Sequence, residues 1–334
     1  MMPLSAIDAI SPSWERAKKL LFEPFSMKRF VKLGLMAFLG IIGGAFLVNI
    51  GQLAGLGVAF EIFGKATSMP IFAGLLAGIV VLAILGIGAL YLGSRARLAD
   101  LWMIATGDTS VGRAWSRSGR ATWPFSLAFL IWVAIMTAGV FAIVVVFFGS
   151  FISSMRSGSH PNPDAMFLMV MVLWVAMFPV MMVATAVQIF IRDFMAVPLL
   201  FDDASVGMAW QTSKEIVRQS PGQCALFLLM YFVIGMVISL AVQIGLFVVL
   251  VASAIPGGVI GFGIYQLSKN MGHTGQILLI APAAAVGAAW ILFVMFVLWG
   301  AGQLVLQCYS AYFVGSRNRV LGDMLQPPTD ASPA

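Results

Sequence analysis

The amino-acid sequence predicts an all-α integral membrane protein with six transmembrane helices, and three observations lead to this fold class. First, 61% of the 334 residues are hydrophobic and 10% are charged, whereas a soluble domain carries about 25% charged residues. Second, six apolar stretches are long enough to cross a bilayer, which takes about 20 residues. Third, the connections between these stretches alternate between rich and poor in Lys and Arg, as in multi-pass membrane proteins.

The six predicted spans are apolar segments separated by polar connections. In chain order they are Val31–Phe60, Ile71–Gly93, Trp123–Ile152, Met166–Ile191, Cys224–Ala254 and Gln276–Val314. Several are longer than a bilayer requires, so we expect tilting, kinking or continuation of these helices beyond the membrane. The connections are too short to form an independent soluble domain.

The distribution of basic residues predicts the orientation of the chain. Of the 19 Lys and Arg residues, 16 lie in the N-terminal region (counting Lys32, just inside the first span), the connections after the second and fourth spans, and the C-terminal tail. The other three, Lys65, Arg156 and Lys269, lie in the remaining connections. Because basic connections stay in the cytoplasm, both termini are predicted to be cytoplasmic.

The sequence also contains an internal repeat. Residues 108–115 read Asp-Thr-Ser-Val-Gly-Arg-Ala-Trp, and residues 203–210, 95 positions later, read Asp-Ala-Ser-Val-Gly-Met-Ala-Trp. A looser copy, Asp-Ala-Ile-Ser-Pro-Ser-Trp, occupies residues 8–14. We therefore predict one membrane domain, residues 1–334, built from three parallel repeats of a cytoplasmic amphipathic helix plus a transmembrane hairpin. The repeats cover residues 6–106, 107–201 and 202–324, followed by a flexible tail, 325–334. Many alternating-access carriers instead use inverted repeats, so parallel repeats weakly disfavour a carrier, although they also occur in transporters.

Each copy of the motif has the pattern of a helix start. Ser110 and Ser205 are predicted N-caps, and Ser11 followed by Pro12 gives the same start. From Ser11 onwards an apolar face recurs at helical spacing, formed by Trp14, Ala17, Leu20 and Leu21. This pattern predicts a helix lying on the cytoplasmic membrane surface, with a docking surface for a soluble partner as the alternative. The candidate interfacial anchors are Trp14, Trp115 and Trp210.

Charged side chains are absent from the middle of the predicted spans, which argues against a proton-coupled pump and against an aspartyl or metal-dependent intramembrane protease. The arginines at the cytoplasmic span ends are candidate contacts for an anionic lipid or an acidic partner segment, with snorkelling and topology setting as the alternative. These residues are Arg95, Arg97, Arg192, Arg317 and Arg319.

Four glutamines form a candidate intramembrane polar seam: Gln188, Gln243, Gln303 and Gln307. Such side chains usually join helices by hydrogen bonds, and a pathway for a polar substrate is the alternative. Two cysteines, Cys224 and Cys308, and two histidines, His160 and His273, are too few and too scattered for a disulfide framework or a zinc site. No nucleophile motif, phosphate-binding loop or metal-ligand helix is present, so we expect no catalytic residues, no cofactor and no metal.

Two segments carry a family resemblance. Residues 6–16 read Ala-Ile-Asp-Ala-Ile-Ser-Pro-Ser-Trp-Glu-Arg and precede Leu-Leu-Phe-Glu-Pro-Phe at 20–25, while Pro-Leu-Leu-Phe-Asp-Asp at 198–203 runs into the second octamer. These segments resemble a bacterial and archaeal family of uncharacterised six-span membrane proteins, which are similar to the membrane domain attached to some glycerophosphodiester phosphodiesterases. The resemblance implies a place in the cytoplasmic (inner) membrane and supplies no catalytic residues. The soluble phosphodiesterase domain is not within this sequence, so that reaction is not implied.

Two functions remain as hypotheses. The first is a non-catalytic scaffold or subunit of a membrane protein complex, whose partners would be membrane lipids and other membrane or cytoplasmic-face proteins rather than nucleic acid. The second is a transporter, flippase-like protein or channel for a lipidic or weakly polar solute. A continuous cavity lined by the four glutamines would favour the second.

Overall fold

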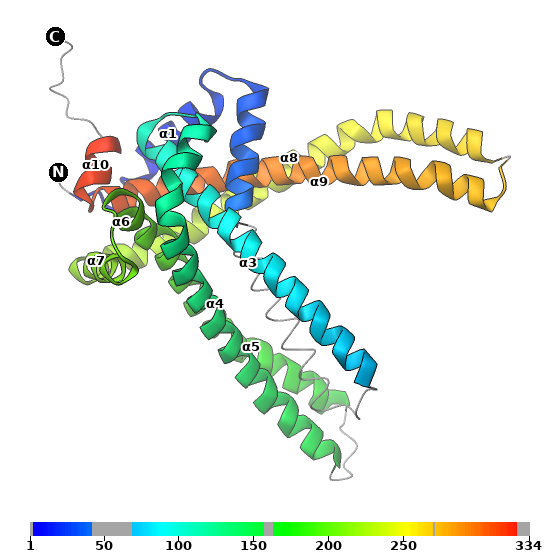
Figure 1. Ribbon diagram of the computed structural model, residues 1–334, viewed down its shortest axis with the longest axis horizontal. Coiled ribbons are helices and arrows are strands. Elements are labelled where there is room, and N and C mark those ends of the chain that lie inside the picture. The colour runs from blue at the N-terminus through cyan, green and yellow to red at the C-terminus, as the bar shows by residue number, and fades with distance from the viewer. Residues whose placement is uncertain (1–2, 42–68, 157–162, 270, 326–334) are drawn as a thin grey trace.

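The computed structural model describes residues 3–41, 69–156, 163–269 and 271–325, and within these ranges it is helical, with no strand. The helices are α1 (Ile10–Phe22), α3 (Met69–Thr106), α4 (Val111–Arg156), α5 (Pro163–Ile189), the π-helical turn η1 (Phe190–Met195), α6 (Ala196–Phe201), α7 (Val206–Gln219), α8 (Pro221–Ser268), α9 (His273–Gly315) and α10 (Arg319–Leu325). Residues 27–41 are also helical. Figure 1 shows their arrangement.

Five helical segments are long and apolar enough to cross a bilayer. They are Val80–Thr106, Val111–Ile143, Met177–Phe201, Pro221–Ser268 and Thr274–Gly315. Five of the six predicted spans fall on these segments, which makes the chain a membrane-embedded protein. Most of the first predicted span, residues 42–60, lies outside the described residues.

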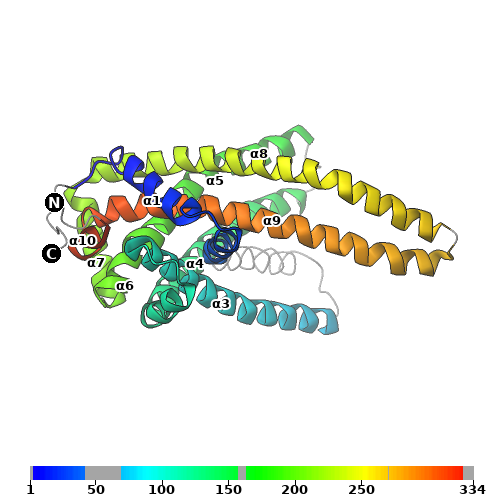
Figure 2. The ribbon, with the colours of Figure 1, turned by 90° about the horizontal axis from the view of Figure 1, so that it is seen from above.

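The long helices extend from one end of the molecule. There α1, α6, α7 and α10 gather together (Figure 1), and we call this region the packed end. In Figure 2 the long helices all extend away from it in the same general direction, whereas Figure 1 shows the α8–α9 pair diverging from α3, α4 and α5. The strongest helix pairings join α3 with α4 and α8 with α9.

The hydrophobic core lies at the packed end. An aromatic cluster joins Phe194 of η1, Phe227 of α8, and Tyr309 and Phe313 of α9, with the Phe227 ring stacked 4.4 Å from Phe313 and 5.2 Å from Tyr309. Away from this end the helices expose their apolar side chains, as at Ile255, which is 74% exposed. Such surface is stable in lipid but not in water.

The span ends differ from the prediction at α3. The sequence places the end of the second span at Gly93 and puts Arg95 and Arg97 in a connection, but α3 continues without a break to Thr106. The helix continues because its last turns enter the packed end, where Leu98 and Ile104 are fully buried. Hydropathy alone could not reveal this extension, since the apolar signal stops at the first charged residues.

The helix starts follow the predicted motif in two of three copies. Ser205 caps α7, its hydroxyl accepting from the N–H of Met208 at 3.4 Å, and Ser110 stands immediately before α4. The N–H of Ser110 donates to the carboxylate of Asp108 at 2.9 Å, and this hydrogen bond lowers the pKa of Asp108. The third start is wrong. α1 begins at Ile10 after Ala9, which has no side chain able to cap, and Ser11 lies inside the first turn.

The face that α1 buries also differs from the prediction. Its buried residues are Ser13, Ala17, Leu20 and Leu21, whereas Trp14 is 55% exposed. This face packs against α9, and the hydroxyl of Tyr309 donates to the carbonyl of Ala6 at 3.0 Å. The amphipathic face of α1 therefore covers the protein's own core.

Two glycines bring the helix at residues 27–41 directly against α9. A Cβ built on Gly34 would lie 2.6 Å from the carbonyl oxygen of Val297, and one on Gly300 would collide with the carbonyl of Gly34. One turn further on, the rings of Phe38 and Phe296 stack at 4.2 Å. Small residues allow this close approach of helix backbones in membranes.

Candidate functional site

An ionic junction ties α3 to η1 inside the packed end. Arg97 of α3 donates through Nη2 to a carboxylate oxygen of Asp193, and their side chains are 7% and 0% exposed. Arg192 shares this carboxylate at 3.4 Å through Nε and Nη2, and Nη2 also donates to the hydroxyl of Tyr231 on α8. We call Arg97, Arg192, Asp193 and Tyr231 the ionic junction. Two guanidinium groups thus share one buried carboxylate, and three helical segments meet at it.

The π-helical turn positions two of these residues. η1 interrupts the helix that runs from α5 into α6, and a π turn holds one more residue than an α turn, which changes the direction of the side chains that follow it. In η1, Ile191, Asp193, Phe194 and Met195 are all buried, and Arg192 reaches the junction from the same turn. Turns of this kind are frequent at functional sites.

A second pair of buried polar groups lies next to the junction. Asp100, three residues after Arg97 on α3, is fully buried, and Gln307 of α9 is 2% exposed. Gln307 and Arg97 both lie close enough to Asp100 to act on its carboxylate. The side-chain oxygens of Asp100 and the side-chain amide of Gln307 have no hydrogen-bond partner among the residues that the structure describes. Leaving such groups without partners is costly, which marks the centre of the packed end as polar.

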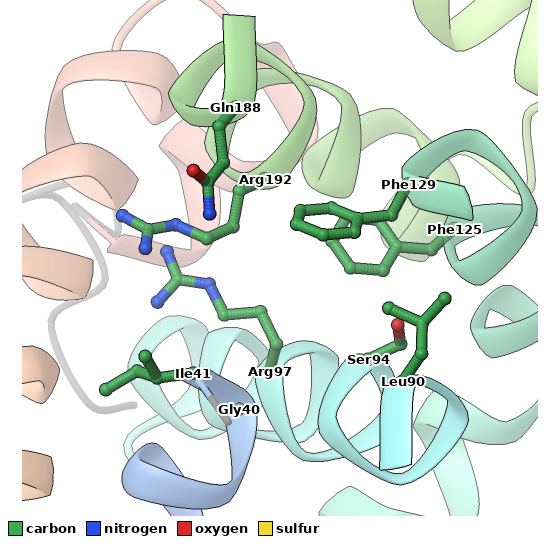
Figure 3. Close-up of a pocket in the computed structure, with 9 residues that line it drawn as sticks. All are labelled: Gly40, Ile41, Leu90, Ser94, Arg97, Phe125, Phe129, Gln188 and Arg192. Carbon is green, nitrogen blue, oxygen red and sulfur yellow. The ribbon is translucent and has the colours of Figure 1, made fainter. Parts of the chain in front are cut away.

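A pocket of about 50 Å³ opens beside the junction. Figure 3 shows the guanidinium groups of Arg97 and Arg192 facing each other, with the amide of Gln188 next to them and the rings of Phe125 and Phe129 at the other end. The remaining lining residues are Gly40, Ile41, Leu90 and Ser94. The pocket therefore has a cationic polar end and an apolar end.

The five arginines at the predicted span ends do not form one ring. Arg97 and Arg192 converge on the pocket, but Arg95 lies over the ring of Trp115 at 4.8 Å and donates to its carbonyl. Arg317 lies over Phe313 at 3.9 Å. Arg319 is exposed at the start of α10. Only two of the five thus share a site.

The glutamines are separated as well. Gln188 lines the pocket, Gln307 is buried beside Asp100, Gln303 is half-buried, and Gln243 is exposed on α8. The pocket contains none of the last three. The described helices therefore do not bring these four side chains to one cavity.

The three tryptophans occupy different surroundings. Trp14 and Trp210 are 55% and 45% exposed, and Trp210 meets Phe190 of η1 edge to face at 5.1 Å. Trp115 is half-buried beneath Arg95. Two of them thus present their indole rings at the surface of the packed end.

The sequence carries one signal for part of the ionic junction. Arg97 and Arg192 stand 95 positions apart, the same spacing as the two octamers, so they occupy matching positions. The pairing of Asp193 with Arg97 and of Tyr231 with Arg192 carries no such signal, because these partners are 96 and 39 residues apart in the sequence. In the described ranges, no three His, Cys, Asp or Glu residues are grouped to hold a metal ion. Cys224 and Cys308 are buried free thiols.

Comparisons with known proteins give a family and no activity. No curated protein matches the chain, and no solved structure matches it either. One family model, described as "Family of unknown function (DUF7544)", matches residues 4–324, nearly the whole chain. This membrane-embedded, all-helical chain therefore belongs to DUF7544, a family of unknown function.

Proposed function

We propose that this chain is a non-catalytic membrane scaffold, a subunit that holds other membrane proteins together. Its packed end is fastened internally by the ionic junction and the aromatic cluster, whereas its long helices present apolar surface outwards. A protein that acts by binding neighbours needs this combination of a rigid base and accessible helix faces. The resemblance of short sequence segments to the membrane domain attached to some glycerophosphodiester phosphodiesterases would fit this role, since the phosphodiesterase reaction belongs to their separate soluble domain.

The observation that carries the proposal is the outer part of the α8–α9 hairpin. These helices pack against each other, yet apolar side chains on their other faces are largely exposed, including Phe247 at 67% and Leu278 at 72%. On α8, added Cβ atoms at Gly257 and Gly261 would meet nothing within 4 Å. Glycines four residues apart allow another helix to approach closely, which favours a protein neighbour at this face.

The orientation proposed with this function has six spans and both termini in the cytoplasm of a bacterium or archaeon. Its support is the excess of Lys and Arg on the connections that lie toward the packed end. The three repeats would then be α1 with the first hairpin, α4 with α5, and α7 with α8 and α9. The transporter hypothesis loses its main support, because Gln243 is exposed and the pocket includes only one of the four glutamines.

The test is purification of the tagged full chain from its native membrane in mild detergent, followed by mass spectrometry. A scaffold is expected to co-purify with a partner at fixed stoichiometry. The double variant Gly257→Leu/Gly261→Leu is expected to lose that partner, because two bulky side chains block the helix face. Gly139→Leu on α4, another glycine facing open space, is the matched control. Recovery of wild type without any protein partner would overturn the proposal.

A further inference from the structure

We infer that the pocket beside the ionic junction binds the phosphate group of an anionic membrane lipid. Its cationic end would hold the phosphate between Arg97 and Arg192, and its apolar end would receive the start of the lipid's hydrocarbon. The inference does not depend on a protein partner, since the site lies within one chain.

Charge is the first argument. Arg97 and Arg192 bring two guanidinium groups to the lining of the pocket, and they share the carboxylate of Asp193. Asp100 and Asp193 are not among the residues that line the pocket. Guanidinium groups are suited to phosphate because their N–H donors match its oxygens in pairs. An anion between the two guanidinium groups would also relieve their mutual repulsion.

The polar side chains beside the arginines are the second argument. Gln188 directs its amide toward the two guanidinium groups (Figure 3), and an amide N–H can donate to a further phosphate oxygen. Ser94 contributes a hydroxyl to the lining from α3. Arg97 is 6% exposed, so its charge is held in a built site rather than on a solvated surface.

Size is the third argument. A cavity needs about 10–15 Å³ of volume to hold one water molecule. The pocket beside the ionic junction has about 50 Å³, so it accommodates a group of a few heavy atoms. A phosphate group fits this description, but a whole metabolite or a complete lipid does not. The rest of the ligand must therefore extend out of the pocket.

The surroundings decide between a lipid and a free phosphate ion. Phe125, Phe129 and Leu90 give the pocket a hydrocarbon-like wall, which a free ion does not use. On the same stretch of α4, Trp123 is 61% exposed and lies 6.5 Å from the ring of Tyr91, centroid to centroid. Trp and Tyr gather at the level of lipid headgroups, so the pocket lies at the depth where lipid phosphates are found. Leu127, 41% exposed, continues the apolar surface toward the membrane.

The experiment measures lipid binding to the purified full chain in a neutral detergent by native mass spectrometry and thermal unfolding. The probes are phosphatidylglycerol, phosphatidylcholine with the same acyl chains, and inorganic phosphate. Phosphatidylglycerol is expected to bind saturably and raise the unfolding temperature more than the other two. If inorganic phosphate gives the full effect, the site is for a soluble anion. If phosphatidylcholine matches phosphatidylglycerol, the site does not recognise the anion. Either result overturns the inference.

Variants locate the binding. Gln188→Leu and Arg192→Gln are each expected to weaken phosphatidylglycerol binding by about tenfold or more, the effect of losing one hydrogen bond to a charged group. Arg218→Gln removes an exposed arginine of α7, elsewhere on the packed end, and is expected to leave binding unchanged. Gln188→Leu leaves the ionic junction intact, so it remains informative if Arg192→Gln fails to fold. Unchanged binding by a well-folded Gln188→Leu protein, or an equal loss in Arg218→Gln, would refute the assigned location.

Discussion

Arg97 and Arg192 stand 95 residues apart, the spacing of the two octamers, and their guanidinium groups face each other at one pocket (Figure 3). Facing like charges is unfavourable unless a counter-charge lies between them. Asp193 supplies that charge from the same turn as Arg192. Asp193 therefore joins two arginines that share the spacing of the octamers, whereas residue 98, which stands 95 positions before Asp193, is Leu.

Breaking the buried ion pair is expected to destabilise the protein strongly. Asp193→Asn leaves two guanidinium groups without their carboxylate, at a cost of about 3–5 kcal/mol. The double variant Arg97→Gln/Asp193→Asn is expected to cost less than the sum of its single variants, because the pair acts as a unit. The measurement is thermal unfolding in detergent. Arg120→Gln, which removes an exposed pair with Asp203, is the control and should cost about 0–1 kcal/mol. Equal effects of Asp193→Asn and Arg120→Gln would contradict the role of the junction.

The contact between Gly34 and Gly300 is expected to reject even one methyl group. Gly300→Ala places its Cβ against the carbonyl of Gly34, where the backbone rather than a flexible side chain must move. We therefore expect the free energy of unfolding to fall by about 1–3 kcal/mol or more. Gly287→Ala lies on the same helix in open space and is expected to be neutral or to stabilise by up to about 1 kcal/mol. Unfolding temperatures of the two variants give the comparison, and similar values would show that the helices are not in contact there.

Arg16 is expected to hold α1 onto the end of α3. It donates through Nε to the carbonyl of Ile104 at 2.8 Å and through Nη2 to Ala105 at 3.0 Å, two carbonyls that the last turn of a helix leaves without partners. Arg16→Gln should increase hydrogen exchange throughout α1, whereas Glu15→Gln on the exposed face should not. Faster exchange in both variants would mean that α1 is held mainly by general surface charge.

The start of α4 is expected to respond to pH through Asp108. The hydrogen bond from Ser110 lowers the pKa of this carboxyl below 3.8 in the folded chain, so the ionised form contributes stability above that pH. The contribution is lost as the pH falls through the folded pKa. Hydrogen exchange in the first turn of α4 should therefore differ between wild type and Asp108→Asn near neutral pH. The difference should disappear in strong acid, and its persistence there would exclude the carboxylate as the cause.

The orientation can be tested with membrane-impermeant maleimide. Asp323→Cys, on α10, and Asp203→Cys, between α6 and α7, are expected to react only when the cytoplasmic face is accessible. Met271→Cys, at the tip of the α8–α9 hairpin, is expected to react only from the opposite face. The native thiols Cys224 and Cys308 are buried and provide a low background. Labelling of Asp323→Cys and Met271→Cys from the same side would contradict the proposed topology.

The sequence predicted the long helices because apolar runs of this length have few alternatives. It did not predict that α3 extends through Arg95 and Arg97, since a charged residue ends a hydropathy signal even when other helices bury it. The cap at Ser11 was assigned by analogy with Ser110 and Ser205, but α1 starts at Ile10.

The candidate site was predictable only in part. Arg97 and Arg192 were identified as functional candidates from charge alone. Their common partner Asp193, and the separation of Gln243 from Gln188, depend on which helix faces meet. Pairing of helices across a hundred residues leaves no local pattern in a single sequence.

The ionic junction also has a consequence for how the protein is made. The ribosome adds Asp193 96 residues after Arg97, an interval of about 5–20 s at common rates of synthesis. During that time Arg97 lacks the Asp193 carboxylate to which it donates in the finished fold, so we expect an unfinished chain to remain open there and to be recognisable to membrane proteases. Chains truncated before Asp193 should therefore be degraded quickly, and Arg97→Leu should lengthen their lifetime. Synthesis of Asp193, just after the fourth predicted span, would therefore allow the packed end to close. By this difference, a protease would distinguish a chain that contains Asp193 from one that stops before it.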